Sequence, residues 1–207
     1  MKTAKVQERK IKAGTKDVFQ NSILERLTRS HVAVPISIFI GFSIFLLYLG
    51  VSQMGLSVLT SIILFFIGLV LFSLMEYLVH KHLFHMLTDT SLKEKIQYNF
   101  HGIHHEYPKD KDRLAMPPLV SILIGITLFY TFRYLMGDYV FAFLPGIMFG
   151  YSSYLFVHYA VHAFQPPKNF LRILWINHGI HHYKNPDVAF GVSSPLWDYI
   201  FRTIPKK

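Results

Sequence analysis

Two long apolar regions dominate the chain, and polar segments rich in basic residues flank and separate them. The first region runs from Val34 to about Val79 with Glu76 as its only charged residue, and the second runs from Pro117 to Phe164. At a rise of about 1.5 Å per helical residue, each region has room for two passes of about 20 residues through a bilayer. The pattern predicts an all-α integral membrane protein with four transmembrane helices, arranged as two hairpins whose tips lie near residues 50–55 and 133–139.

The basic residues predict which ends of these helices face the cytosol. Six Lys and Arg lie between Lys81 and Arg113 and six between Lys168 and Lys207, whereas the hairpin tips contain only Arg133. Cytosolic loops are enriched in Lys and Arg, so both termini and the central segment are expected on the cytosolic side. Residues 1–30 are predicted to be a basic cytosolic segment, and residues 31–207 a single membrane-embedded domain.

The composition agrees with a membrane protein and limits its chemistry. Of 207 residues, 52% are hydrophobic and 16% are charged, well below the roughly one quarter of charged residues in soluble domains. The chain has no cysteine, so any metal must bind nitrogen or oxygen ligands. The net charge of +9 indicates contact with anionic membrane lipids and no nucleic acid, because the basic residues flank the apolar regions and form no separate module.

Ten of the twelve histidines fall into four groups, and each group lies at the edge of an apolar region. Burying imidazoles beside hydrocarbon costs free energy unless they bind something, and neutral imidazole is the commonest metal ligand in proteins. The predicted topology brings all four groups to one membrane face. The isolated His31 and His82 are expected to be ordinary interfacial residues. The four groups are His80 and His85; His101, His104 and His105; His158 and His162; and His178, His181 and His182.

The spacing within most groups is that of side chains on one helix face. Residues three and four apart project together, so both His-x(2)-His-His sets and the pair His158 and His162 can each converge. His80 and His85 are five apart, which separates them by about 140° on an unbroken α-helix. One of the two is therefore expected beyond the helix end or after a bend, although no Gly or Pro lies between them.

The number of imidazoles predicts two metal ions, because zinc takes about four ligands and iron about six. Two neighbouring iron ions can activate dioxygen for attack on a C–H bond, and a lipid acyl chain is the substrate that this location offers. A proton relay and a non-enzymatic metal transporter or sensor stay open as alternatives. Glu76, one turn before His80, is expected to orient that ring as an acceptor, and Asp187 and Asp198 are candidates for the same role.

Longer motifs surround the histidines, and in their order they resemble the fatty acid hydroxylase superfamily over roughly residues 70–205. They are most similar to the fatty acid 2-hydroxylases that act on sphingolipid acyl chains. The histidine motifs alone are shared with sterol desaturases, C4-methyl sterol oxidases and carotenoid hydroxylases, so a hydroxylase or desaturase of a sterol or carotenoid is the alternative. The motifs are Glu76-Tyr77-x(2)-His80-x(4)-His85, Phe100-His101-Gly102-Ile103-His104-His105, Arg113-Leu114-Ala115-Met116-Pro117-Pro118, His178-x(2)-His181-His182-Tyr183-Lys184-Asn185 and Phe190-Gly191-Val192-Ser193-Ser194-x(2)-Trp197-Asp198.

The resemblance implies four transmembrane helices under a cytosolic, histidine-rich helical cap with a di-iron centre, in which zinc can replace iron in purified protein. The implied reaction inserts one atom of dioxygen, the co-substrate, at the carbon next to the acyl carbonyl and consumes two electrons. The implied ligands of one metal are His80, His85, His101, His105 and His181, and those of the other are His104, His158, His162, His178 and His182.

The chain departs from the family pattern in two ways, one of which concerns the electron donor and the other the lipid substrate. Eukaryotic relatives often carry a fused cytochrome-b-type haem domain, which residues 1–30 cannot form, so a separate ferredoxin or cytochrome-b-type protein is expected to donate electrons. The family also tends to place Asp where this chain has Leu155, which leaves the head-group contact and the sphingolipid substrate open. Tyr151 and Tyr154 are candidate substrate contacts. The expected location is the endoplasmic reticulum of a eukaryote or the inner membrane of a bacterium, with the metals at the cytosolic face.

Overall fold

The computed structural model describes residues 14–17 and 20–205, and every regular element in this part of the chain is helical. The all-α fold class is therefore confirmed for these residues. Residues 1–13 and 18–19 of the predicted N-terminal segment lie outside the described part. The long helices are α2 (Ala33–Ser52), α3 (Val58–Val79), α6 (Pro118–Met136) and α7 (Val140–Ala163). The shorter helices are α1 (Ser22–Leu27), α4 (Ser91–Gln97), α5 (Ile103–Glu106), α8 (Arg172–Tyr183) and α9 (Leu196–Ile200).

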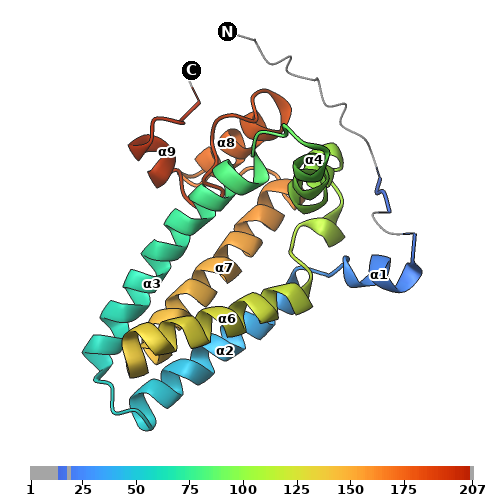
Figure 1. Ribbon diagram of the computed structural model, residues 1–207. Helices are drawn as coiled ribbons and strands as arrows, with labels where there is room; N and C mark the ends of the chain where they lie inside the picture. Colours follow the sequence, from blue (N-terminus) through green and yellow to red (C-terminus); the bar gives the residue numbers. More distant parts are fainter. Residues whose placement is uncertain (1–13, 18–19, 206–207) are drawn as a thin grey trace.

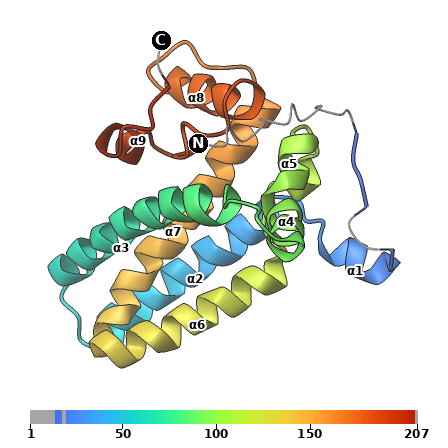
Figure 2. The same cartoon turned by 45° about the horizontal axis from the view of Figure 1, so that its top comes forward.

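The long helices form a bundle, and α4, α5, α8 and α9 lie beyond one end of it (Figures 1 and 2). Among the described residues, three helical stretches are long and apolar enough to cross a membrane: Ala33–Ser52, Val58–Phe84 and Lys111–Ala163. The third stretch contains both α6 and α7, which are joined by a short 3-10 turn. The number of passes and their orientation stay predictions.

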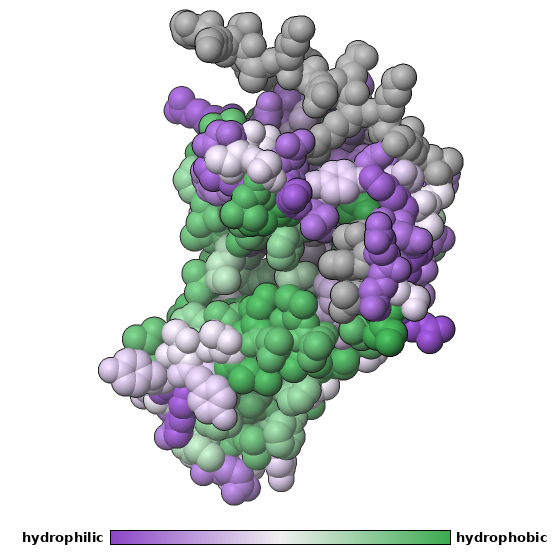
Figure 3. Space-filling model, turned by 45° about the vertical axis from the view of Figure 1, so that its right-hand side comes forward, coloured by the Kyte–Doolittle hydropathy of each residue, from purple (hydrophilic) through white to green (hydrophobic). Residues whose placement is uncertain are grey.

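Apolar and polar residues on the surface are divided in the same way between the bundle and the short helices beyond its end. Figure 3 shows hydrophobic residues gathered over the middle of the molecule, hydrophilic residues gathered at the end that carries the short helices, and a smaller hydrophilic group at the opposite tip of the bundle. Side chains such as Leu59, Ile62, Phe66 and Leu123 are exposed although they are apolar. Exposed apolar side chains on long uncharged helices are what a protein presents to lipid.

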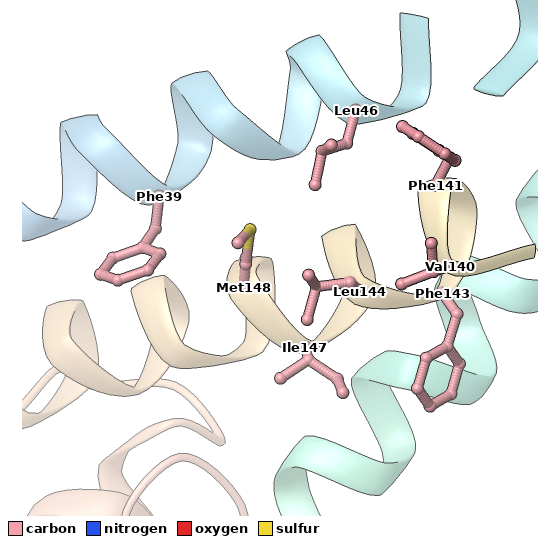
Figure 4. Packing of buried hydrophobic residues seen from close by; sticks show 8 residues of the cluster. All are labelled: Phe39, Leu46, Val140, Phe141, Phe143, Leu144, Ile147 and Met148. Carbon is pink, nitrogen blue, oxygen red and sulfur yellow. The ribbon is translucent and has the colours of Figure 1, made fainter. Parts of the chain in front are cut away.

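Helix α7 is the centre of the bundle, because α2 and α3 both pack along it. Phe39 and Leu46 of α2 meet buried side chains of α7 in the main apolar cluster (Figure 4). On the other side of α7, a Cβ atom at Gly146 would lie 1.9 Å from the carbonyl oxygen of Phe65 in α3. Small residues allow such close approach of membrane helices. The contact holds the histidine-bearing ends of α3 and α7 at the same end of the bundle.

A buried ion-pair network attaches α1 to the segment between α5 and α6. Glu25 pairs with Arg29 at 2.9 Å and also with Arg113, and the Arg113 guanidinium lies 3.4 Å from Asp110. The side chains of Arg113 and Asp110 are almost completely buried. The network thus fixes the chain that leads from the histidines of α5 into α6.

Candidate metal centre

A π-helical turn resolves the spacing of His80 and His85. Helix α3 ends at Val79 and continues as a π-helix over His80–Phe84, in which the His85 N–H donates to the His80 carbonyl oxygen at 3.1 Å. The wider turn brings residues five apart back toward one side, and the two imidazole centroids lie 5.1 Å apart. The expected bend is therefore a local widening of the helix. Such widenings are frequent at functional sites.

The second set of histidines lies on a similar irregular segment. A π-helix over Tyr98–Gly102 carries His101, and the short α5 that follows carries His104 and His105. The side-chain Nε2 of Gln97 donates to the Phe84 carbonyl oxygen at 3.0 Å, which joins the two π-helical turns. His101 consequently faces the ring of His80, and the centroids are 4.7 Å apart.

The remaining histidines come from two regular helices. His158 and His162 lie on the last turns of α7, and α8 carries its three histidines on one buried face. The four sets meet as two groups of five, in each of which the potential ligand atoms all lie within 4.8 Å of one another. The first histidine group is His80, His85, His101, His105 and His181, and the second histidine group is His104, His158, His162, His178 and His182.

The two groups have the composition that the resemblance implies, and they are in contact. The rings of His105 and His182 stack at 4.2 Å between centroids with 15° between their planes. Nearly all ten side chains are buried; His85 and His162 are half-buried. His31 and His82 are exposed and belong to neither group.

Electrostatics keep these imidazoles neutral. Burial lowers the pKa of the six histidines outside the apolar stretches well below its usual range, and the neighbouring imidazoles lower it further, because adjacent cations repel. A neutral imidazole has one nitrogen with a free lone pair, which is the form that binds metal. The six are His101, His104, His105, His178, His181 and His182.

The donor atoms of the first group fit a cation. The Nδ1 atoms of His80 and His181 donate to the carbonyl oxygens of Phe190 and Val188 at 2.6 and 2.8 Å, so both Nε2 atoms carry lone pairs. The Nε2 of His181 is buried and has no hydrogen-bond partner among the described residues. The Nε2 of His101 lies 3.0 Å from that of His80. Ligands bound at about 2.1 Å and at right angles on one ion lie about 3 Å apart.

The second group offers the same kind of donor set. The Nε2 atoms of His104 and His158 are 2.9 Å apart, and those of His162 and His178 are 2.8 Å apart. Both ring nitrogens of His182 are buried without a partner among the described residues. Buried nitrogens at these separations suit a second ion coordinated by imidazole alone.

Of the three candidate orienting carboxylates, Glu76 and Asp198 accept hydrogen bonds from the backbone and none from histidine. Glu76 was expected to accept from His80, and this is wrong: its Oε1 accepts the N–H groups of Val192 and Ser193 at 2.7 and 2.8 Å. The Asp198 carboxylate is completely buried and accepts the N–H groups of Phe190 and Gly191. Asp187 is exposed. Glu76 and Asp198 thus hold the loop whose carbonyl groups orient two histidines.

One tyrosine of α7 contacts the second histidine group, and another lies behind it. The ring of Tyr154 stacks on that of His158 with centroids 5.4 Å apart, and Tyr151 stacks on Tyr154 at 6.3 Å. The Tyr151 hydroxyl is 3.2 Å from the Ser121 hydroxyl. Leu155, where the family tends to have Asp, is 1% exposed and packs against Val32 and Ala115, so it faces an apolar contact within the bundle.

Sequence reasoning missed the role of residues 188–193. The carbonyl groups of Val188 and Phe190 act through the backbone, so no residue type marks them. Ala189 has a positive φ of 57°, which is uncommon for a residue other than glycine. The motif Phe190-Gly191-Val192-Ser193 was recognised as typical of the family, and Gly191 in it was the available signal for a backbone constraint.

Comparison with known proteins relates the chain to a family of lipid-modifying enzymes. The family model described as fatty acid hydroxylase matches residues 65–203. The chain is 40% identical over 154 residues to the fatty acid 2-hydroxylase of Homo sapiens, with 70% of this chain and 40% of that protein covered. It is 34% identical over 139 residues to a dihydroceramide fatty acyl 2-hydroxylase of Arabidopsis thaliana, with 67% and 59% covered.

A solved structure shares the fold. Full-length scs7p, of which only the hydroxylase domain is visible, superposes with a TM-score of 0.85 at 30% identity, over 93% of this chain and 73% of that chain. The chain spans 40% and 59% of the length of the human and Arabidopsis relatives. The family match includes all ten clustered histidines and both carboxylates. The chain therefore belongs to the fatty acid hydroxylase family.

Proposed function

We propose that the protein is a membrane di-iron monooxygenase that hydroxylates a lipid acyl chain at carbon 2, in a free fatty acid or in the N-acyl chain of a sphingolipid. The observation that supports this most is the convergence of ten buried histidines into two adjacent groups of five. Relatives of this chain are named as fatty acid and dihydroceramide fatty acyl 2-hydroxylases. The substrate and the position of attack are inferred from those names.

Each histidine group would hold one iron ion, and zinc can take the same nitrogen sites. Bound iron would supply the activation of dioxygen: one oxygen atom would enter the C–H bond, and the other would leave as water with two electrons from an external donor and two protons. The chain itself keeps the ligands neutral and excludes water from them by burial. No side-chain nucleophile or acid–base pair is required.

The acyl chain would approach along the aromatic residues under the second group. Tyr154 lies against His158, and Phe72 of α3 lies 6.5 Å from Tyr154 between ring centroids. These rings would provide an apolar wall beside the histidines, and the Tyr151 and Tyr154 hydroxyls are the candidate polar contacts for the substrate. They would align the chain so that the carbon next to the carbonyl reaches the metals.

The membrane arrangement would be four passes in two hairpins, with the histidine groups in a cytosolic cap. The excess of Lys and Arg at the histidine-bearing end supports this orientation. The electron donor would be a ferredoxin or a cytochrome-b-type protein that reaches the same face. The membrane would be the endoplasmic reticulum in a eukaryote or the inner membrane in a bacterium.

The test is turnover by purified, iron-loaded protein in lipid nanodiscs with a reduced ferredoxin and its reductase, or with a reduced cytochrome-b-type protein. Ceramide, a free fatty acid, a sterol and a carotenoid are supplied separately under ¹⁸O₂. We expect one ¹⁸O atom at carbon 2 of an acyl chain, located by fragmentation in the mass spectrometer. Products that lack two hydrogens, oxidation of only the sterol or carotenoid, or no oxidised lipid despite bound iron and reduced donor would overturn the proposal.

A further inference from the structure

The two histidine groups differ in how their outward-facing nitrogens are held. In the first group, the Nδ1 atoms of His80 and His181 donate to carbonyl groups of residues 188–190. In the second group, His158 has a backbone hydrogen bond with Leu114, whereas the Nδ1 atoms of His104, His178 and His182 are buried and have no partner within the described part of the chain. A hydrogen bond at the outer nitrogen fixes the tautomer and the orientation of a metal-bound imidazole. The first group is therefore the more rigidly prepared of the two.

The loop of residues 188–193 that supplies these carbonyl groups is itself held by the two carboxylates. Four consecutive backbone N–H groups, of residues 190 to 193, donate to Asp198 and Glu76 at 2.7 to 2.9 Å. Glu76 also accepts from the Ser193 hydroxyl, and Asp198 accepts from the Thr203 hydroxyl at 2.7 Å. Each carboxylate thus has several donors, as buried charged groups require.

The loop has little freedom to adopt another shape. Ala189 has a φ of 57°, and its N–H donates to the Thr203 carbonyl oxygen at 2.9 Å. A Cβ atom at Gly191 would lie 2.1 Å from the Ser194 carbonyl oxygen and 2.9 Å from the Asp198 carboxylate. A left-handed residue persists when its surroundings over-determine it. The carbonyl groups of Val188 and Phe190 are consequently fixed in direction.

We propose that Glu76 and Asp198 are positioning residues that act through this loop, and that they make the first histidine group the tighter of two metal sites. The chain of contacts runs from carboxylate to backbone N–H, through one or two peptide units to a carbonyl group, and from there to the Nδ1 of His80 or His181. The proposal rests on the proposed function in one respect, namely that both groups bind metal.

The test measures the release of metal from the purified full-length chain loaded with Fe²⁺ without oxygen and then challenged with a chelator. Two metals should leave in two phases, the slower one from the first group. In Asp198→Asn, the side-chain NH₂ group would face a backbone N–H that donates to the carboxylate in the wild type. Two donors would then oppose each other, so the loop should shift. We expect the slow phase to become about 10- to 100-fold faster, which is the usual effect of losing an orienting partner, with little change in the fast phase.

Two further variants guard against a fold defect in Asp198→Asn. Gly191→Ala removes no hydrogen-bonding group but pushes the loop away from Asp198, and Glu76→Gln keeps one acceptor oxygen; both should accelerate the slow phase. Asp187→Asn is the matched control, because its carboxylate is exposed in the same region. A general loss of stability would accelerate both phases together.

Combining Asp198→Asn with a variant that lacks one histidine shows which of the two groups the substitution affects. In His104→Ala, where the second group is incomplete, Co²⁺ bound to the first group should show visible absorption bands that Asp198→Asn shifts. In His181→Ala, where the first group is incomplete, Asp198→Asn should change neither the Co²⁺ spectrum nor its release. Equal acceleration of both phases, or no acceleration in any of the three variants, would overturn the proposal. If the wild-type chain binds fewer than two metals, the proposed function fails instead.

Discussion

The bundle and the cap of this protein keep their shape by different means. In the bundle, α7 packs against α2 and α3 through apolar side chains and through a backbone contact at Gly146. In the cap, the residues 80–113 and 164–205 beyond the bundle, specific hydrogen bonds hold the backbone, such as those from the N–H groups of Val192 and Ser193 to Glu76 at the end of α3. Apolar packing tolerates change, whereas a buried polar group that loses its partner is costly.

The largest expected effect is on activity and comes from the cap. His181→Ala and His104→Ala each remove one imidazole from a group of five, and we expect either to reduce hydroxylation by at least about 100-fold, beyond the usual effect of losing only an orienting partner. His82→Ala is the matched control, because His82 is exposed next to the same region. Product formation is measured with the electron donor present. Near-normal turnover by either ligand variant would contradict the assignment.

The next effect concerns ion pairs. Arg113→Met leaves the buried carboxylate of Asp110 without its guanidinium and leaves Glu25 with Arg29 alone, and breaking such a buried pair typically costs about 3–5 kcal/mol. Arg133→Met removes the partner of Asp138 at the other end of the bundle, where both side chains are about half-exposed, and exposed pairs contribute about 0–1 kcal/mol. Chemical unfolding in detergent compares the two variants. Equal losses would show that the network between α1 and the cap is dispensable.

Metal removal should destabilise the cap and spare the bundle. A ligand at about 100 times its dissociation constant stabilises the folded state by about 2.7 kcal/mol, and the ligand atoms here join the two π-helical turns, α5, α7 and α8. Hydrogen exchange with and without a chelator is the measurement. We expect protection to fall over residues 98–106 and 172–183 and to stay unchanged over Ala33–Ser52. Uniform loss of protection would contradict a separate response of the cap.

The smallest effect is within the bundle. Gly146→Ala places a methyl group 1.9 Å from the Phe65 carbonyl oxygen, so α3 and α7 must separate, and overpacking of this kind costs about 1–3 kcal/mol. Gly41→Ala is the control, because a Cβ atom there meets nothing within 4 Å. Thermal unfolding compares the variants, and metal content checks the cap. A variant at Gly146 as stable as the control would show that the close contact is not required.

The difference between apolar packing in the bundle and specific hydrogen bonds in the cap also explains what could be predicted from the sequence. Hydropathy locates the apolar helices well, because burial in lipid depends on composition over about 20 residues; the break between α6 and α7 at Gly137–Tyr139 falls within the predicted tip. The π-helical turn at His80–Phe84 was not predicted, because no Gly or Pro marks it and only its tertiary contacts select it. The interpretation of Glu76 failed for a related reason, since its partners are backbone N–H groups over 110 residues away.

For the histidine groups, the sequence predicts which residues take part but not how their rings are oriented. Their membership could be read from residue type and from the family resemblance, because imidazole is a specific ligand. Their orientation could not, since it depends on the carbonyl groups of Val188 and Phe190, which every residue type possesses. The left-handed backbone of Ala189 is likewise invisible in the sequence.

We propose that each group of five histidines holds its own metal ion. The decisive measurement counts the iron atoms per chain in protein purified without oxygen, for the wild type, His181→Ala, His104→Ala and the double variant. We expect two atoms in the wild type, one in each single variant and none in the double variant. A wild-type value of one, or complete loss of iron from both single variants, would contradict two separate sites.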